Sequence, residues 1–148
     1  MVREVKEETM EEALDLVTRT FNESMAPSYS KEAADNFRNF IERIRQGEEK
    51  DVKMWFYNVG DEMAGVFALS EPDRISLCFV DKAFQGRKIA TELFEAVKVI
   101  LIARCVSMIK VDAFPETSDF YRKLGFRTLG KETEKNGMKY IPMGYILM

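Results

Sequence analysis

Hydrophobic and polar residues alternate along the chain with two different periods. Between residues 89 and 100, apolar side chains recur every three or four positions, which predicts a helix with one buried face. Just before it, residues 75–80 read ISLCFV, a run of β-branched, aromatic and other apolar residues that predicts a buried or half-buried strand. Asp81 ends this strand. The helix is expected to begin near Gly86 or Arg87, so this stretch reads as strand, short turn and helix.

The first third of the chain predicts one strand and two helices. Residues 2–6 alternate in the manner of a short edge strand, and Thr9 followed by Glu12 is the pattern of a helix capping box. A second helix is expected to begin after Ser30 as its cap and to end at Gly47.

Three antiparallel strands are predicted in the middle of the chain. Residues 52–59 and 63–70 are strand-like runs, and Gly60–Asp61 between them is a hairpin signal. The turn-forming residues 71–74 then lead into the strand at residues 75–80.

The last third predicts a strand, a short helix and a hairpin. Residues 108–113 are an apolar strand, and residues 119–124 have the pattern of a short helix. Residues 126–129 and 140–148 are expected to pair as a final hairpin around Asn136–Gly137.

These elements predict an α/β (α+β) fold in one domain. A strand, a helix and a second strand need a crossover, so residues 75–80 and 108–113 are expected to be parallel neighbours. The pattern therefore predicts a single mixed, mostly antiparallel sheet of about seven strands flanked by about four helices. A chain of 148 residues suits a single domain over residues 1–148.

The amino-acid composition excludes several classes of protein and of active site. With 46% hydrophobic and 32% charged residues and a net charge of -3, we expect a soluble globular protein without a nucleic-acid partner. The absence of histidine excludes Ser–His and Cys–His nucleophilic pairs and histidine-ligated metals, and we expect no metal site. Cys78 and Cys105 have neither metal nor disulfide spacing, which favours a reducing cytoplasm. No signal peptide or membrane-spanning stretch is expected.

The turn before the helix has the layout of an anion site. The first N–H groups of a helix have no intrahelical partner, so this end can hold a phosphate. Arg87 and Lys88 add two cations there. An ordinary strand–turn–helix connection with a glycine and surface cations is an equally open interpretation of this segment alone.

A second segment of the chain favours the anion site over the ordinary connection. Residues 120–126 read FYRKLGF after DAFPETSD and, together with FVDKAFQGRKIA, they resemble in order and separation the two signature segments of the GNAT-type N-acyltransferases. The resemblance implies that acetyl-coenzyme A is the cofactor. It implies further that its pyrophosphate is wrapped by the backbone of the segment matching [Q/R]-x-x-G-x-[G/A], here Gln85, Gly86, Arg87, Lys88, Ile89 and Ala90. Thr91 either adds a hydroxyl contact or caps the helix.

Lys88 occupies the position where the family usually has its central glycine. A helical φ is open to any L-residue, so we expect the turn to tolerate Lys88, and its ammonium is a candidate phosphate contact. The resemblance also implies that the strands at residues 75–80 and 108–113 splay apart and admit the pantetheine arm, which pairs along Phe79 and Val80. A backbone N–H near these two residues is expected to polarise the thioester carbonyl.

For the chemistry, the resemblance implies that Tyr121 is the acid that protonates the departing sulfur; a structural aromatic is the alternative. The general base is open among Glu71, Asp73 and Asp112, each of which also fits a solvated residue at a strand end. Phe114 stands where the family often has a cofactor-contacting asparagine.

The family's acceptor pocket lies near the first two helices, so Met25, Ser28 and Tyr29 are candidate substrate contacts, or else ordinary loop residues. Aromatic residues of the strands, among them Trp55 and Phe67, are further candidates, although such residues more often belong to the core.

The leading hypothesis is an acetyl-CoA-dependent N-acetyltransferase that transfers its acetyl group directly to a primary amine of an unidentified small-molecule or peptide acceptor. The alternative is a catalytically silent member of the fold that binds acyl-CoA as a sensor or partner domain, which the departures at Lys88 and Phe114 motivate. A nucleotide-binding protein is disfavoured because no Gly-rich phosphate motif of that class occurs. Exposed strand edges in the final hairpin make a homodimer plausible.

Overall fold

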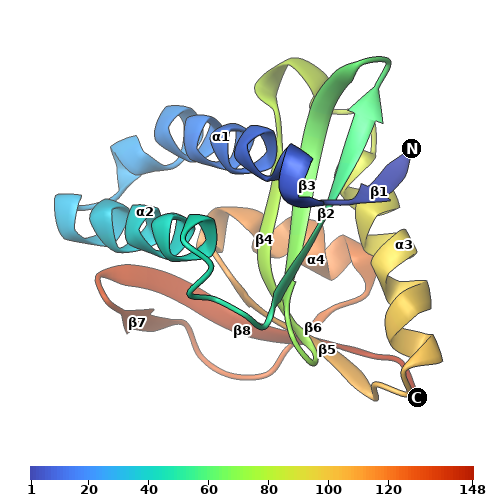
Figure 1. The fold of residues 1–148 in the computed structure, drawn as a ribbon. Helices are drawn as coiled ribbons and strands as arrows, with labels where there is room; N and C mark the ends of the chain where they lie inside the picture. The colour runs from blue at the N-terminus through green and yellow to red at the C-terminus, as the bar shows by residue number, and fades with distance from the viewer.

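The computed structural model describes residues 1–148 as one mixed sheet with helices on both faces (Figure 1). In chain order the elements are β1 (Val2–Glu4), α1 (Glu7–Ser24), η1 (Ala26–Ser28), α2 (Lys31–Arg45), β2 (Val52–Val59), β3 (Glu62–Ser70), β4 (Arg74–Val80), η2 (Lys82–Phe84), α3 (Ile89–Ala103), β5 (Met108–Ala113), η3 (Pro115–Thr117), α4 (Ser118–Leu124), β6 (Arg127–Thr128), β7 (Thr133–Lys135) and β8 (Met138–Ile146).

The sheet has eight strands in the order β1-β2-β3-β4-β5-β8-β6, with β7 paired to β8. Only β4 and β5 are parallel. The predicted mixed sheet and its parallel pair are therefore confirmed. The strand missing from the prediction is β7, which forms the hairpin with β8 around Asn136–Gly137, while the shorter β6 pairs with β8 further along.

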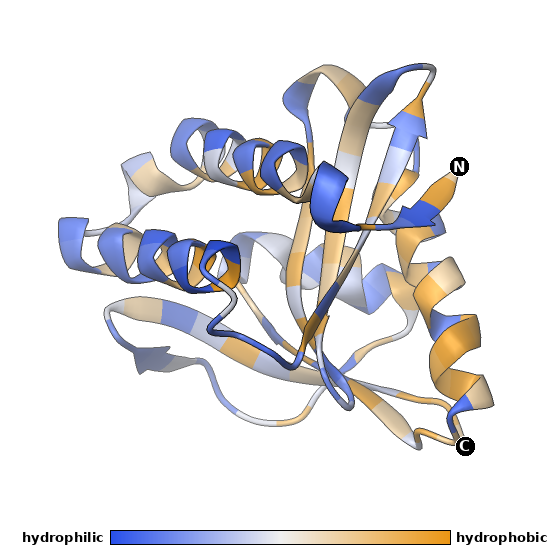
Figure 2. Ribbon diagram, in the orientation of Figure 1, coloured by the Kyte–Doolittle hydropathy of each residue, from blue (hydrophilic) through white to orange (hydrophobic).

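Two hydrophobic cores lie on opposite faces of the sheet. Met54, Phe56 and Val66 pack under α1 and α2, whereas Trp55 and Phe67, one position along each strand, pack under α3. Figure 2 shows α1 and α2 as largely hydrophilic helices, while α3 is hydrophobic over most of its length. The middle of the sheet is thus buried on both sides, which explains the continuous apolar run of β3.

A β-bulge interrupts β4 next to the parallel pair. Leu69 pairs with Ile75 and Ala68 pairs with Leu77, so Ser76 is an extra residue in β4. Ile75 consequently packs in the core under α3, while Leu77 packs in the core under α1 and α2. In a regular strand, residues two positions apart lie on the same face, and the bulge places Ile75 and Leu77 on opposite faces instead.

The parallel pairing of β4 and β5 is short. It joins Arg74 to Lys110 and Ile75 to Val111, and it stops there although β4 continues to Val80 and β5 to Ala113. The strands therefore part toward their C-terminal ends, beginning at the bulge.

Two predicted helix starts need correction. The first helix begins at Glu7, and Thr9 lies inside its first turn, where its Oγ1 accepts a hydrogen bond from the Lys6 N–H at 2.9 Å. The helix after β4 begins at Ile89, later than predicted, because Gly86 and Lys88 have left-handed backbones with φ of 82° and 60°. The prediction of a helical φ for Lys88 is therefore wrong.

The cap of α2 is confirmed, since the Ser30 Oγ accepts a hydrogen bond from the Ala33 N–H at 3.1 Å. None of the helices combines the length and apolar character needed to cross a bilayer.

Candidate active site

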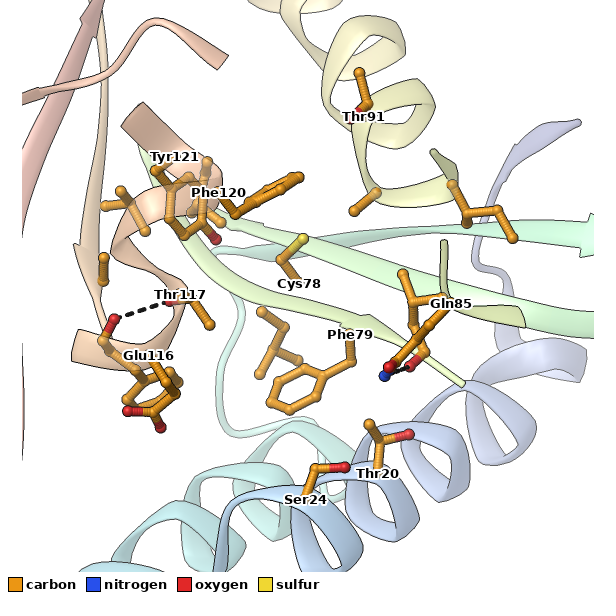
Figure 3. A pocket seen from close by; sticks show the side chains of 18 of the residues that line it. Thr20, Ser24, Cys78, Phe79, Gln85, Thr91, Glu116, Thr117, Phe120 and Tyr121 are labelled. Carbon is orange, nitrogen blue, oxygen red and sulfur yellow. Dashed lines mark hydrogen bonds between the residues drawn. The ribbon is translucent and has the colours of Figure 1, made fainter. Parts of the chain in front are cut away.

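A cavity of about 710 Å³ lies where β4 and β5 part (Figure 3). Its walls come from β4, the end of β5, the turn that leads into α3, the segment that includes η3 and α4, and the C-terminal end of α1. The lining residues are Thr20, Ser24, Met25, Ile75, Ser76, Leu77, Cys78, Phe79, Val80, Phe84, Gln85, Gly86, Lys88, Ile89, Ala90, Thr91, Val111, Asp112, Ala113, Phe114, Glu116, Thr117, Phe120 and Tyr121.

The turn at residues 85–91, here called the amide turn, has unpaired backbone donors. No backbone N–H from Gln85 to Thr91 donates a hydrogen bond to any acceptor in the protein, and the first helical bond runs from Glu92 to the Lys88 carbonyl at 3.0 Å. Most of these residues line the cavity. A run of free N–H groups at a helix N-terminus is a site for an anion, and phosphate is the anion that such turns commonly hold.

The side chains of the amide turn have separate roles. Lys88 lines the cavity and is the only cation that does so. The Arg87 guanidinium lies outside the lining, over the ring of Phe84 at 5.3 Å from its centroid. Gln85 Nε2 donates to the Val80 carbonyl at 3.2 Å and so ties the turn back to β4 (Figure 3). Of the predicted cofactor-binding residues, only Arg87 lies outside the cavity.

An ion pair fixes the start of this turn to α1. Asp81 Oδ1 accepts a hydrogen bond from the Ala83 N–H at 2.9 Å, and Asp81 Oδ2 binds Arg19 of α1. The Ala83 hydrogen bond, with a smaller contribution from Arg19, holds the pKa of Asp81 below its ordinary value. The carboxylate thus stays ionised and keeps the turn in place at neutral pH.

The edge of β4 beside the cavity has no partner strand. Beyond Ile75 no residue of β4 pairs with β5, so, apart from the Val80 carbonyl that Gln85 binds, main-chain groups near Phe79 and Val80 are open to an added extended segment. The Phe79 ring packs in the core against Phe37, with 5.7 Å between centroids. This edge fits an elongated ligand with amide groups.

Tyr121 reaches the cavity from α4, and Cys78 reaches it from β4. Burial raises the pKa of Tyr121 well above its ordinary value, and the neighbouring Cys78 thiol adds to the effect. Burial also raises the pKa of Cys78 to about 12. Both groups therefore keep their protons at neutral pH, so the Tyr121 hydroxyl is available as a hydrogen-bond donor and Cys78 is present as a thiol.

The acidic candidates differ in position. Neither Glu71 nor Asp73 lines the cavity, because both precede β4. Glu71 pairs with Lys53 and Arg104 at 3.7 and 3.4 Å, and Asp73 pairs with Lys110 at 3.5 Å.

Asp112 does line the cavity, but it pairs with Arg74 at 3.1 Å. All three predicted bases are therefore engaged with cations, and two lie away from the cavity.

Among the candidate acceptor contacts, Met25 lines the cavity and Ser28 does not. Tyr29 lies just outside the lining, and its hydroxyl donates a hydrogen bond to Glu116, which does line it. Trp55 and Phe67 belong to the core under α3 and are not part of the cavity.

Glu116 was missed by sequence reasoning. It lies in the short η3 turn, where an acidic residue ordinarily faces solvent, and its partner Tyr29 is 87 residues away. No local pattern signals this contact. Elsewhere, no group of three or more His, Cys, Asp or Glu side chains is arranged to hold a metal ion.

The fold resembles those of several solved acetyltransferases. The chain is similar to a GCN5-related N-acetyltransferase from Rhodopseudomonas palustris (20% identity, 99% of this chain and 95% of that chain, TM-score 0.84). It is also similar to the PaiA N-acetyltransferase of Thermoplasma acidophilum in complex with coenzyme A (16% identity, 99% and 98%, TM-score 0.76). A third similar structure is an aminoglycoside 6′-N-acetyltransferase complexed with coenzyme A (12% identity, 100% and 97%, TM-score 0.74). At these identities the likeness shows the fold alone.

No curated protein sequence matches the chain. Residues 25–147 match the family model described as an acetyltransferase (GNAT) domain, which covers most of the chain and agrees with the amide turn and the parted strands. The chain therefore belongs to the GNAT family of acetyltransferases.

Proposed function

We propose that this protein transfers an acetyl group from acetyl-CoA directly to a primary amine of its acceptor. The observation that carries the proposal is the run of backbone N–H groups from Gln85 to Thr91 that have no acceptor in the protein. Backbone donors at a helix start are well suited to a diphosphate, because they need no special side chain and the helix dipole favours negative charge.

Other features of the cavity fit the rest of such a donor. Lys88 supplies a cation beside the amide turn, and the unpaired edge of β4 past Ile75 suits the amide-containing pantetheine arm. When bound, acetyl-CoA supplies an acetyl group activated as a thioester. In the transfer the C–S bond breaks, a C–N bond forms, and the sulfur leaves with the bonding electron pair and takes a proton.

Tyr121 is the residue placed to give that proton. Its raised pKa keeps the phenol protonated over the physiological pH range, so its Oη is a donor toward the cavity. Its ring is held between Phe120 and Phe126, with centroids 5.2 and 5.3 Å away. This packing fixes the position of the hydroxyl, which general acid catalysis requires.

The similar structures support the proposal. Two of them are complexes with coenzyme A, and one is described as acting on aminoglycosides, which are amines. We further propose a reducing compartment such as the cytoplasm, because Cys78 and Cys105 are both free.

A second candidate is a silent acyl-CoA-binding domain. It is favoured by the positions of Glu71 and Asp73 outside the cavity and by Phe114 at the place of a cofactor-contacting asparagine.

Titration with coenzyme A by calorimetry, followed by thiol release from acetyl-CoA over a panel of primary amines, separates the two candidates. The proposal predicts binding together with amine-dependent thiol release. Binding with no thiol release for any amine in the panel would favour the silent domain instead.

A further inference from the structure

The end of the cavity away from the amide turn contains one unpaired charge. Three charged side chains line the cavity: Lys88 in the amide turn, Asp112 and Glu116. Asp112 is neutralised by Arg74 at 3.1 Å, whereas Glu116 takes part in no ion pair. Figure 3 shows Glu116 beside Thr117 on the side opposite Gln85. That end of the cavity is therefore negative.

Tyr29 orients the Glu116 carboxylate. Its hydroxyl donates to Glu116 Oε1, which leaves the second carboxylate oxygen without a partner in the protein. Burial, with Glu116 as a further cause, raises the pKa of Tyr29, so it remains a hydrogen-bond donor. The Tyr29 ring lies 6.0 Å from Phe114 and 6.3 Å from Phe21, and this aromatic packing fixes the hydroxyl that holds the carboxylate.

The surface beside Glu116 is mostly apolar. Met25, Phe79 and Phe114 line the cavity, and the Phe114 ring lies 6.0 Å from that of Tyr29, the partner of Glu116. Figure 3 shows Phe79 between Glu116 and Gln85, with the hydroxyls of Ser24 and Thr20 on α1 below it and Thr20 on the side of Gln85. No cation lies at this end, since Lys88 is part of the amide turn. A carboxylate on the acceptor would meet Glu116 without a compensating charge, whereas an ammonium would be attracted to it.

We propose that Glu116 binds the ammonium group of the acceptor, and that the acceptor is a small monoamine with an apolar body and no α-carboxylate. The inference rests on the proposed acetyl transfer and specifies its substrate class. The apolar body packs against Met25, Phe79 and Phe114, and the ammonium binds the free oxygen of Glu116.

The proposal also gives the protons a route. The ammonium carries three protons and the amide product keeps one on nitrogen. One of the other two passes to the Glu116 carboxylate and on to solvent, to which this residue is exposed. The second proton leaves the nitrogen for the solution. Tyr121 gives one proton to the leaving sulfur and its phenolate takes one back from the solution, so each turnover releases one proton.

The test compares amines with their α-carboxylated counterparts. Thiol release is measured for phenethylamine against phenylalanine and for isoamylamine against leucine, in the wild type and in Glu116→Gln, Glu116→Asp and Asp119→Asn. Asp119→Asn is the matched control, because it removes an exposed carboxylate three residues away that lies outside the cavity and pairs with Arg122. Coenzyme A affinity is measured by calorimetry for every variant.

We expect kcat/KM for each amine to exceed that of its amino acid by at least about tenfold. Glu116→Gln should lower kcat/KM for the amines by about ten- to a hundredfold, the range for losing a hydrogen bond to a charged group. The loss should appear in KM, because the ammonium loses its partner, and in kcat, because the proton acceptor is removed. Glu116→Asp should recover part of this loss, Asp119→Asn should lose none, and coenzyme A affinity should stay the same throughout.

Three outcomes overturn the inference while leaving acetyl transfer intact. These are equal turnover of amines and amino acids, wild-type kinetics in Glu116→Gln, and turnover of other primary amines with none of the four compounds. Absence of coenzyme A binding in the wild type is a different result, and it overturns the proposed function as well.

Discussion

The two ends of the cavity are built from the chain in different ways. The proposed donor end is a contiguous segment, residues 85–91, whose backbone N–H groups have no acceptor in the protein and are the proposed binding groups. The proposed acceptor end combines α1 and Tyr29 with Glu116, which lies 87 residues after Tyr29, and its proposed recognition groups are side chains.

The difference determines how each end responds to mutation. At a backbone site, a substitution acts through main-chain conformation or local charge, and most side chains are tolerated. At a side-chain site, the identity of one residue decides what binds. Variants at the donor end should therefore alter coenzyme A affinity, and variants at the acceptor end should alter substrate choice.

The largest effect is expected at Tyr121, which reaches the cavity from α4. Tyr121→Phe removes the proton donor and should lower kcat by about 10²- to 10⁴-fold, the usual contribution of general acid catalysis. Coenzyme A affinity should change by less than about threefold, because the amide turn is untouched. Tyr145→Phe is the matched control, since this ring packs 5.4 Å from Phe126 but lies outside the cavity. Unchanged turnover in Tyr121→Phe would remove Tyr121 from the acid role.

A substitution at Gly86 tests whether coenzyme A binding at the donor end depends on the backbone conformation of the amide turn. Its φ is 82° with open space around the position of a Cβ, so Gly86→Val acts through the backbone alone. A β-branched residue in this region costs about 1–3 kcal/mol, and we expect coenzyme A to bind at least about tenfold more weakly.

Gly47→Val is its control, because Gly47 has a φ of 75°, equally open surroundings and a place at the end of α2 away from the cavity. Both variants should lose similar stability in urea unfolding, and only Gly86→Val should lose affinity. Equal affinity in the two variants would contradict a backbone-built site.

Substitutions at Lys88 and Arg87 test how much their positive charges add to the coenzyme A affinity of the amide turn. Lys88→Glu should weaken coenzyme A binding by roughly tenfold, because this side chain lines the cavity. Arg87→Glu makes the same change of charge one residue earlier, where the side chain lies over Phe84, and should weaken binding less. Calorimetry at two salt concentrations measures the coenzyme A affinity of both variants. Identical losses of affinity would show that only the overall electrostatic potential of the turn matters, and not a contact made by Lys88.

The smallest effect concerns the strain at Lys88. Its φ of 60° is a left-handed conformation, which costs a non-glycine residue about 1–2 kcal/mol. Lys88→Gly should remove this cost and raise the free energy of unfolding by up to about 1 kcal/mol, since the greater freedom of glycine in the unfolded chain offsets part of the gain. Urea unfolding measures it. A loss of stability would mean that the Lys88 side chain makes contacts that outweigh the strain.

The contrast between the two ends also explains what could be predicted from the sequence. The donor end is predictable because its signals, the strand at residues 75–80, Gly86 and the following helix, are adjacent in the chain. The mixed sheet and its parallel strands follow from the same unit, because a strand–helix–strand crossover allows few alternatives.

The features that sequence reasoning missed depend on contacts or on backbone geometry. The left-handed Lys88 and the bulge at Ser76 leave no mark in hydrophobic periodicity, although together they set the start of α3 and the faces of β4. Glu116 becomes a candidate only through its hydrogen bond with Tyr29 and its position in the lining of the cavity, and the sequence shows neither. By contrast, Glu71 and Asp73 are candidates by residue type, and their ion pairs with lysine and arginine arise from the packing of strand and helix ends.

The central claim is that the backbone N–H groups of residues 85–91 bind the diphosphate of coenzyme A. The most direct measurement is a titration of the ¹⁵N-labelled protein with coenzyme A, followed through its amide NMR signals. The account predicts that the largest shifts fall on the amides from Gly86 to Thr91, with smaller shifts along Phe79 and Val80. Saturating coenzyme A that leaves the signals of residues 86–91 in place, or that shifts mainly amides elsewhere, would contradict it.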